Sequence, residues 1–306
     1  MNFGPERARG LQTVWPALAG AAQAASVAMP GSGQAQGWLQ VLSLTALAVG
    51  LVRIAHSLNQ ARFSIKQAAW LGGIFATAWL AGCFWWLYVS MHDMGGLPAP
   101  LAVLAVVALA AALALYYAAA AAVWVALSRR GLWVQRPGLA SALFSALWTL
   151  AELMRGRWLT GFPWGAGGYA HVDSVLSAWA PWVGVYGMGF LAALLAYAVA
   201  SLASSAWHRA LAWMRQPVRP APVRGTVGKV GVYVSNTAAR VQVRSVSWPG
   251  VVRGVLVWTF TGALLISMVG GGEAWRQLGH ADTASEGELR VWLLQGNIPQ
   301  DQKFEP

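Results

Sequence analysis

The sequence predicts an all-α polytopic membrane protein with about seven transmembrane helices, followed by the first strand of an incomplete α/β domain. Two observations predict this class. The 306 residues are 57% hydrophobic and only 10% charged, whereas a typical soluble domain carries about 25% charged residues. Apolar runs long enough to cross a bilayer, which takes about 20 residues, occur seven times along the chain. The composition therefore argues against an ordinary soluble protein.

The expected spans are separated by short polar segments, except for one long basic loop over residues 207–250. They lie near Leu11–Met29, Trp38–His56, Lys66–Val89, Ala99–Leu127, Gly138–Arg155, Trp179–Ala206 and Val251–Gly272. The loop should rest on anionic lipid headgroups, although parts of it alternate like the strands of a hairpin. We expect residues 1–275 to form the transmembrane domain. Residues 276–306 should form a linker and the start of a second domain, with a strand over 290–295.

The positive charges predict the orientation. With the N-terminus inside, most of the 21 Lys and Arg residues fall in inner segments, and most acidic residues fall outside. This distribution follows the positive-inside rule and puts the C-terminal segment on the outer side. The net charge of +11 therefore reflects topology, and no nucleic-acid partner is expected. A signal peptide is the alternative for the first span, but its apolar stretch is long for one.

An aromatic group ends the third span. Trp85, Tyr88 and His92 are spaced i, i+3 and i+7, so they share one helix face. The turn at residues 95–98 contains two glycines and a proline and should end this helix. The group forms either an interfacial aromatic belt or part of a binding site. A third alternative is a metal site of His92, Asp93, His171 and Asp173. These residues lack the ligand spacing that is typical of zinc sites.

Residues 152–169 are the most informative stretch, because they place charge at the end of a membrane span. Glu152 and Arg155 lie three residues apart and can pair. They form either a structural ion pair or a polar anchor below a lipid-headgroup pocket. Phe162-Pro163-Trp164 and the glycines after it predict a rigid re-entrant or interfacial turn. Glycines 184, 187 and 189 in the next span are expected to be helix-packing residues.

Three separated segments resemble the apolipoprotein N-acyltransferases of bacterial inner membranes. They are Trp86–Pro98, Glu152–Tyr169 with the following Pro181–Gly187, and Val291–Gln300. The resemblance implies an enzyme that moves an acyl chain from a phospholipid donor to the N-terminal diacylglyceryl-cysteine of an apolipoprotein. It implies no cofactor and no metal, and a multi-pass inner-membrane location with the N-terminus cytoplasmic and the C-terminal segment periplasmic.

The resemblance also implies where the chemistry lies. Its Glu-Lys-Cys triad belongs to a periplasmic nitrilase-like domain, and the matching positions would follow Pro306, so this chain should lack catalytic residues and be inactive alone, as a fragment. Cys83 does not match the nucleophile. The substrate-binding candidates are Trp85, Tyr88, His92, Glu152, Arg155, Phe162, Trp164, Tyr169 and Phe304.

Two other functions remain alternatives. A non-catalytic membrane scaffold could dock a separately encoded enzyme. A transporter ranks last, because only Glu152 and Arg53 come close to the polar midplane residues that such proteins need.

Overall fold

The computed structural model describes residues 5–57, 60–129, 137–159 and 161–214. They form helices and connecting turns, without a strand in these ranges. The long helices are α1 (Pro5–Val27), α2 (Gly37–Ala55), α3 (Ala61–Cys83), α5 (Ala99–Arg129), α6 (Pro137–Arg157) and α7 (Ala180–Met214). Short elements are α4 (Trp85–Val89), the π-helix η1 (Ser90–Met94) and the 3₁₀-helices η2 (Gly167–His171) and η3 (Val175–Trp179).

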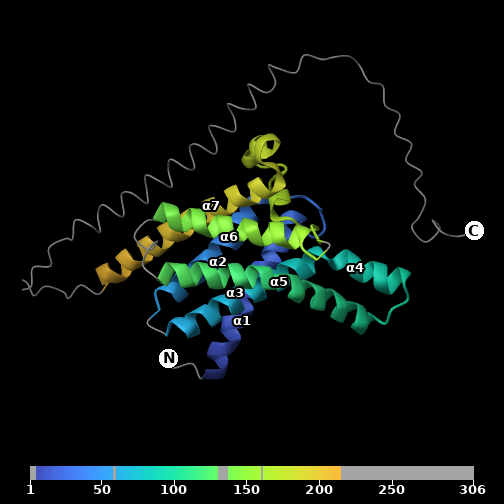
Figure 1. Ribbon diagram of the computed structural model, residues 1–306, viewed down its shortest axis with the longest axis horizontal. Coiled ribbons are helices and arrows are strands. Elements are labelled where there is room, and N and C mark those ends of the chain that lie inside the picture. Colours follow the sequence, from blue (N-terminus) through green and yellow to red (C-terminus); the bar gives the residue numbers. More distant parts are fainter. Residues whose placement is uncertain (1–4, 58–59, 130–136, 160, 215–306) are drawn as a thin grey trace, which may run out of the picture.

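The long helices lie side by side in a bundle. The segment of α4, η1 and the start of α5 projects from one side of it and is called the arm below (Figure 1). The pair α3 and α5 shares the largest contact, followed by α1 with α3 and α6 with α7. Helix α5 is rich in alanine, the best helix former, and has Pro100 in its first turn, where proline is tolerated. Helix α6 likewise begins with Pro137.

Three of the described helical segments are long and apolar enough to cross a membrane: Gly37–Ala55, Ala99–Arg129 and Val175–Ala203. A fourth is added if Ala61–Cys83 and Trp85–Met94 count as one broken span. Helices α1 and α6 occupy two further expected spans, without meeting the same standard of length and apolarity. The expected span Val251–Gly272, the loop beyond Met214 and the strand at 290–295 lie outside the described residues.

The third expected span is not one continuous helix, so that prediction was wrong in detail. Helix α3 ends at Cys83, and the following segment Trp85–Met94 is bent by 54° relative to it. Its second half continues as a π-helix, in which Gly95 N–H donates to the Ser90 carbonyl at 3.0 Å. Gly96 then adopts a φ of +67°, a conformation that suits glycine, and the chain enters α5. The turn at 95–98 ends the helix as expected.

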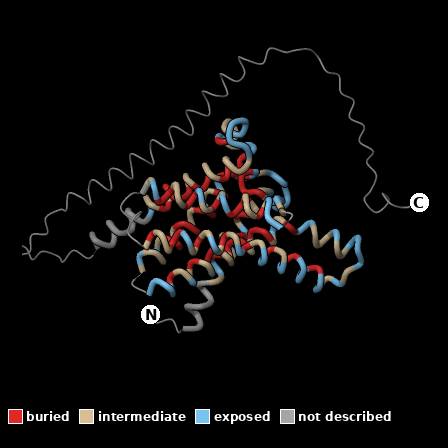
Figure 2. The backbone as a smooth tube through the Cα atoms, in the orientation of Figure 1, coloured by how far each residue is buried: buried red, intermediate tan, exposed pale blue. Residues whose placement is uncertain are grey.

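Aromatic side chains fill the centre of the bundle. The Trp79 ring stacks on Trp148 with centroids 5.7 Å apart and meets the edge of Tyr117 at 5.2 Å. Phe75 adds an edge contact to Trp148 at 5.8 Å. Such pairs contribute about 0.5–1.5 kcal/mol beyond their area burial. Figure 2 shows the buried residues concentrated between the helices, whereas the projecting arm is largely exposed or half-buried.

A pair of glycines on α3 tests how closely α3 and α5 pack. A Cβ atom on Gly72 would lie 2.8 Å from Ala121 Cβ and 2.9 Å from the Tyr117 carbonyl oxygen, whereas one on Gly73 would lie 3.6 Å from Ala118 Cβ. Gly72→Ala should therefore lower the free energy of unfolding by about 1–3 kcal/mol through overpacking. Gly73→Ala should leave it unchanged or raise it by up to about 1 kcal/mol, because alanine favours helix. The melting temperatures of the two purified variants compare them directly, and equal values would contradict this packing.

Helix α7 contains a break that the sequence did not predict. Gly184 has φ +61° and ψ −175° inside the segment, so it marks a kink and is not a helix-packing residue. Gly189 does lie at a close contact, because a Cβ there would stand 2.9 Å from Oε2 of Glu152. The kink separates the turns at η2 and η3 from the straight part of α7 that packs on α6.

Candidate functional site

The segment between α6 and η2 folds as a tight loop that needs unusual backbone angles. Leu159, Gly161 and Gly165 have φ values of +52°, +76° and +72°. A Cβ on Gly161 would collide with the Gly156 carbonyl oxygen, so only glycine suits that position. The loop turns back onto the end of α6, where the Phe162 N–H donates to the Arg155 carbonyl at 2.8 Å. The rigid turn expected from the sequence is thus present.

Arg155 fixes this loop from inside the bundle. Its side chain is only 1% exposed. One terminal nitrogen, Nη1, donates to the carbonyl oxygens of Phe162 at 2.6 Å and Trp164 at 2.7 Å. Nε donates to the Tyr117 hydroxyl at 3.0 Å, and the guanidinium lies 5.9 Å from the centre of the Trp79 ring. The planar, multidentate donor set of arginine can hold several acceptors at once, so Arg155 ties the loop to α5 and α3.

Glu152 holds the far end of the same loop. It is fully buried, and its Oε1 accepts the Gly167 N–H at 2.9 Å. The Gly167 carbonyl accepts from Gln40 Nε2 on α2 at 2.7 Å. Both backbone groups of Gly167 are therefore bonded by buried side chains from different helices. A Cβ at this position would stand 2.5 Å from Gln40 Nε2, so an alanine there would displace the Gln40 amide from its hydrogen bond.

Glu152 and Arg155 do not form the ion pair that was one of the two alternatives for them. Glu152 bonds to Gly167, and Arg155 bonds to Tyr117 and two loop carbonyls. Among the described residues, the one ion pair within 4.0 Å joins His92 and Asp93. The i, i+3 spacing allowed the pairing, but the returning loop offers each side chain backbone partners instead.

Further buried polar atoms lie near these hydrogen bonds. Gln23 on α1 is fully buried, and neither of its amide atoms has a partner in the described part of the chain. The same holds for Gln40 Oε1, Glu152 Oε2 and Arg155 Nη2. Because these groups are shielded, they suit a positioning role better than proton exchange with solvent. The polar cluster at residues 23, 40, 152 and 155 is called the staple below.

The loop carries Trp164 to the wall of an open cavity of about 400 Å³. Trp164 is 58% exposed and meets Trp86 edge to face, with centroids 5.7 Å apart. The cavity lies between these rings, the end of α3 and a wall of small residues at the end of α1 and just after it: Ala21, Ala24, Ala25, Val27 and Ala28. Phe162 points the other way, against Phe84 at 4.8 Å. The cavity is therefore apolar, with aromatic rings on one side.

Tyr169 and His171 line a second cavity, of about 420 Å³, on η2, η3 and α7. Tyr169 is 51% exposed, whereas His171 is 2% exposed. Trp85, Tyr88 and His92 line neither cavity and form their own stack on the projecting arm. The centroids of Trp85 and Tyr88 lie 4.7 Å apart, and those of Tyr88 and His92 5.2 Å apart. The structure thus divides the predicted site into a loop and an arm, and Phe304 lies outside the described residues.

The two histidines of the proposed metal site are engaged locally instead. His92 Nδ1 is 2.7 Å from the Leu97 carbonyl oxygen, and His171 Nδ1 is 2.9 Å from Ser174 Oγ. Within the described ranges, no group of three or more His, Cys, Asp or Glu residues could hold a metal ion.

Burial of His171 predicts a dependence of stability on pH. Burial lowers its pKa from 6.5 to about 4. Between these values the unfolded chain binds a proton that the folded chain does not, so stability falls as the pH decreases from about 6.5 to about 4. His171→Asn should flatten the melting temperature over this pH window. The same slope in the variant and the wild type would assign the effect to another group.

Comparison with known proteins gives a consistent result. Residues 19–198 match the family described as "Apolipoprotein N-acyltransferase N-terminal domain". The chain is 42% identical to the apolipoprotein N-acyltransferase of Verminephrobacter eiseniae over 295 residues, which is 96% of this chain and 46% of the relative. It is 38% identical to the Ralstonia nicotianae protein of the same name over 269 residues, 88% of this chain and 40% of the relative.

This chain belongs to the apolipoprotein N-acyltransferase family. It spans about half the length of the curated relatives that it matches. The acyltransferase family match contains the whole loop and every residue of the staple. The resemblance inferred from the motifs is thus confirmed.

Sequence reasoning missed several residues that build this site within the family domain. Gln23 and Gln40 were not singled out, although a polar amide inside an apolar span is a recognisable signal. Tyr117 lies in an alanine-rich helix and gave no motif. Trp86 was quoted in a family segment but not proposed as a site residue, because Trp85 fitted the helical spacing better.

Proposed function

We propose that this chain is the membrane portion of an apolipoprotein N-acyltransferase. The enzyme would transfer a fatty acyl chain from a phospholipid to the N-terminal diacylglyceryl-cysteine of lipoproteins. The observation that carries the proposal is the apolar cavity between Trp86, Trp164 and α1, which is held open by a loop that buried side chains fix in place. An acyl chain is the kind of ligand that such a wall of alanine and tryptophan would accept.

The topology that we propose has seven spans over residues 1–275, with the N-terminus in the cytoplasm. Residues 276–306 would then lead into a periplasmic nitrilase-like domain. In this orientation α1, α3 and α6 run outwards, so the loop after α6 lies at the outer leaflet. The support comes from the positive-inside distribution of charge and from the antiparallel order of the described helices.

The roles that we propose follow from this placement. Trp164 shapes the entry for the acyl chain, and Phe162 supports the loop by packing against Phe84. Arg155 and Glu152 position both residues. Tyr169 faces the second cavity, where another lipid chain could lie. Trp85, Tyr88 and His92 on the arm, and Phe304, remain candidates for contact with the lipoprotein or the donor lipid. The covalent step is assigned to a Glu-Lys-Cys triad of the nitrilase-like domain.

Replacing Trp164 tests the entry. In the full-length protein, Trp164→Ala should reduce N-acylation of a reporter lipoprotein by about tenfold or more. The variant loses the contact that the indole ring would make with the bound lipid, which is worth about 1.5–3 kcal/mol. Mass spectrometry of the lipoprotein N-terminus measures the product. Trp158→Ala is the matched control, because Trp158 is 60% exposed and lines neither cavity.

Both outcomes of this experiment are informative. Loss of acylation with Trp164→Ala alone supports the lipid entry. Normal acylation by Trp164→Ala at wild-type expression would contradict the assignment of Trp164. No acylation by the wild-type full-length protein would contradict the proposed function and favour a scaffold that docks another enzyme.

A further inference from the structure

A groove distinct from the two cavities described above opens between α1, α2 and α3, away from the loop. It has a volume of about 590 Å³ and is lined by Trp15, Ala46, Val49, Gly50, Arg53, Ile54, Gln67, Trp70 and Leu71. Arg53 lies 13 residues after Gln40 on α2, which is roughly 20 Å along a helix. The groove therefore lies towards the opposite end of the bundle from the staple.

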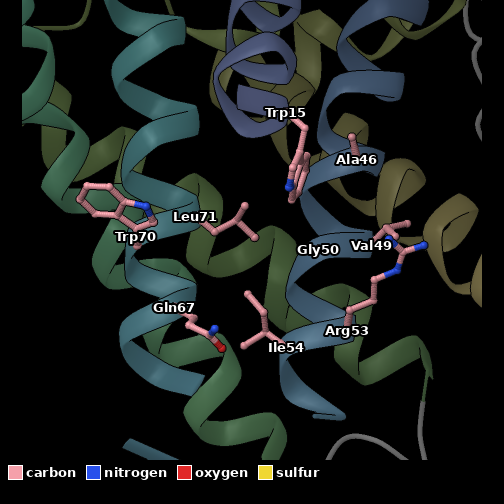
Figure 3. Close-up of a pocket in the computed structure, with 9 residues that line it drawn as sticks. All are labelled: Trp15, Ala46, Val49, Gly50, Arg53, Ile54, Gln67, Trp70 and Leu71. Carbon is pink, nitrogen blue, oxygen red and sulfur yellow. The ribbon is translucent and has the colours of Figure 1, made fainter. Parts of the chain in front are cut away.

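The walls of this groove are apolar and open to the surroundings. Gly50 and Leu71 form its buried floor, and Trp70 is 61% exposed. Figure 3 shows Gln67, Ile54 and Leu71 turned into the space between α2 and α3, with Trp15 above them. Trp70 projects on the other side of α3 and Arg53 on the other side of α2. An apolar groove on a membrane bundle faces acyl chains, so a lipid is its natural occupant.

Two polar side chains in the groove are uncommitted. Neither Arg53 nor Gln67 has a hydrogen-bond or ion-pair partner among the residues that the structure describes. Arg129 differs at the same end of the bundle. It donates to the carbonyl oxygens of Ala55 and Ser57, at 3.3 and 3.0 Å, and so holds α5 to the end of α2. A cation without a partner among the described residues, beside an apolar groove, calls for an anion that carries an apolar chain.

We propose that this groove binds one anionic phospholipid, with its phosphate on Arg53 and an acyl chain along Trp15, Trp70 and Leu71. Arginine binds phosphate through paired hydrogen bonds, and basic pockets between transmembrane helices are typical sites for anionic headgroups. The Gln67 amide would donate to the glycerol ester or the headgroup. In the orientation proposed above, the groove lies in the inner leaflet. That assignment rests on the proposed orientation, whereas the proposal of lipid binding does not.

Photolabelling tests the proposal in the full-length protein. The protein is placed in nanodiscs that contain phosphatidylglycerol with a photoreactive acyl chain, and the labelled peptides are mapped by mass spectrometry. Adducts are expected on the peptides that contain Trp15 and Trp70. Phosphatidylcholine with the same acyl chain should label these peptides about tenfold less, because its own choline cation competes with Arg53 for the phosphate.

Variants separate the headgroup from the chain. Arg53→Gln should reduce phosphatidylglycerol labelling about tenfold. Ala46→Phe should reduce labelling by both lipids, because it fills the groove. Arg62→Gln is the matched control, since Arg62 is an exposed cation on α3 that does not line the groove. Melting temperatures confirm that each variant is folded.

Several results would overturn the proposal. They are equal labelling by the two lipids, adducts on other peptides alone, and unchanged labelling of Arg53→Gln. Protection of the groove by another segment of the chain would appear as the absence of adducts on both tryptophan peptides, and this too would overturn it. Labelling requires no acyl transfer, so failure here is distinguishable from failure of the proposed enzymatic function.

Discussion

Arg155→Met should release the loop after α6 and lower the free energy of unfolding by about 3–5 kcal/mol, the largest effect that we expect in this domain. The substitution removes the donor from the Tyr117 hydroxyl and from the carbonyls of Phe162 and Trp164. Each buried group that loses its partner costs about 1–3 kcal/mol. The melting temperature of the purified protein measures the loss, and N-acylation by the full-length variant should be abolished.

Arg157→Met is the control for Arg155→Met. Arg157 lies two residues further along α6 and is exposed, so its replacement should leave stability unchanged. The comparison also decides between two roles for Arg155, as a structural residue of the staple or as an anchor for a lipid headgroup. If Arg155 acts as part of the staple, its replacement lowers the melting temperature of the protein. A headgroup anchor would instead keep a normal melting temperature and raise the concentration of donor lipid needed for half-maximal rate. The second pattern would contradict the role that we assign.

Replacement of Glu152 should have the second-largest effect. Glu152→Ala removes both the acceptor for the Gly167 N–H and the negative charge near Arg155, and should lower the free energy of unfolding by about 3 kcal/mol. Glu152→Gln keeps an oxygen acceptor in the same place and loses only the charge. We expect its melting temperature to lie between those of Glu152→Ala and the wild type.

The glutamine variant separates structure from chemistry at this position. If Glu152 only positions the loop, N-acylation by the full-length protein should follow the order of melting temperatures. A stable Glu152→Gln variant without activity would show that the carboxylate charge itself is needed. Equal melting temperatures for the alanine and glutamine variants would contradict the hydrogen bond to Gly167.

The staple suggests why charged side chains are placed at this depth. A loop that runs back into the protein interior must satisfy its buried backbone groups, because few waters reach them. Here Arg155 and Glu152 from α6 and Gln40 from α2 supply the donors and acceptors for the loop. The loop can then present Trp164 rigidly at a cavity without a covering helix.

The sequence by itself determined the class of protein, the approximate positions of the described helices and the family. Apolar runs of about 20 residues require no tertiary information, since the bilayer imposes their length on each helix separately. The motif at 152–169 also marked the loop, because charge, proline and clustered glycines are rare together at the end of a span.

Only the tertiary structure decided which groups meet. The i, i+3 spacing of Glu152 and Arg155 allowed a local pair, but the loop returns to α6 and outcompetes it with backbone partners. Gln23, Gln40 and Tyr117 join the site from helices distant in sequence, and no local pattern records such proximity. The bend after Cys83 and the kink at Gly184 likewise appeared only in the structure. Hydrophobic periodicity describes one helix face at a time, whereas a buried polar network depends on all the faces that converge on it.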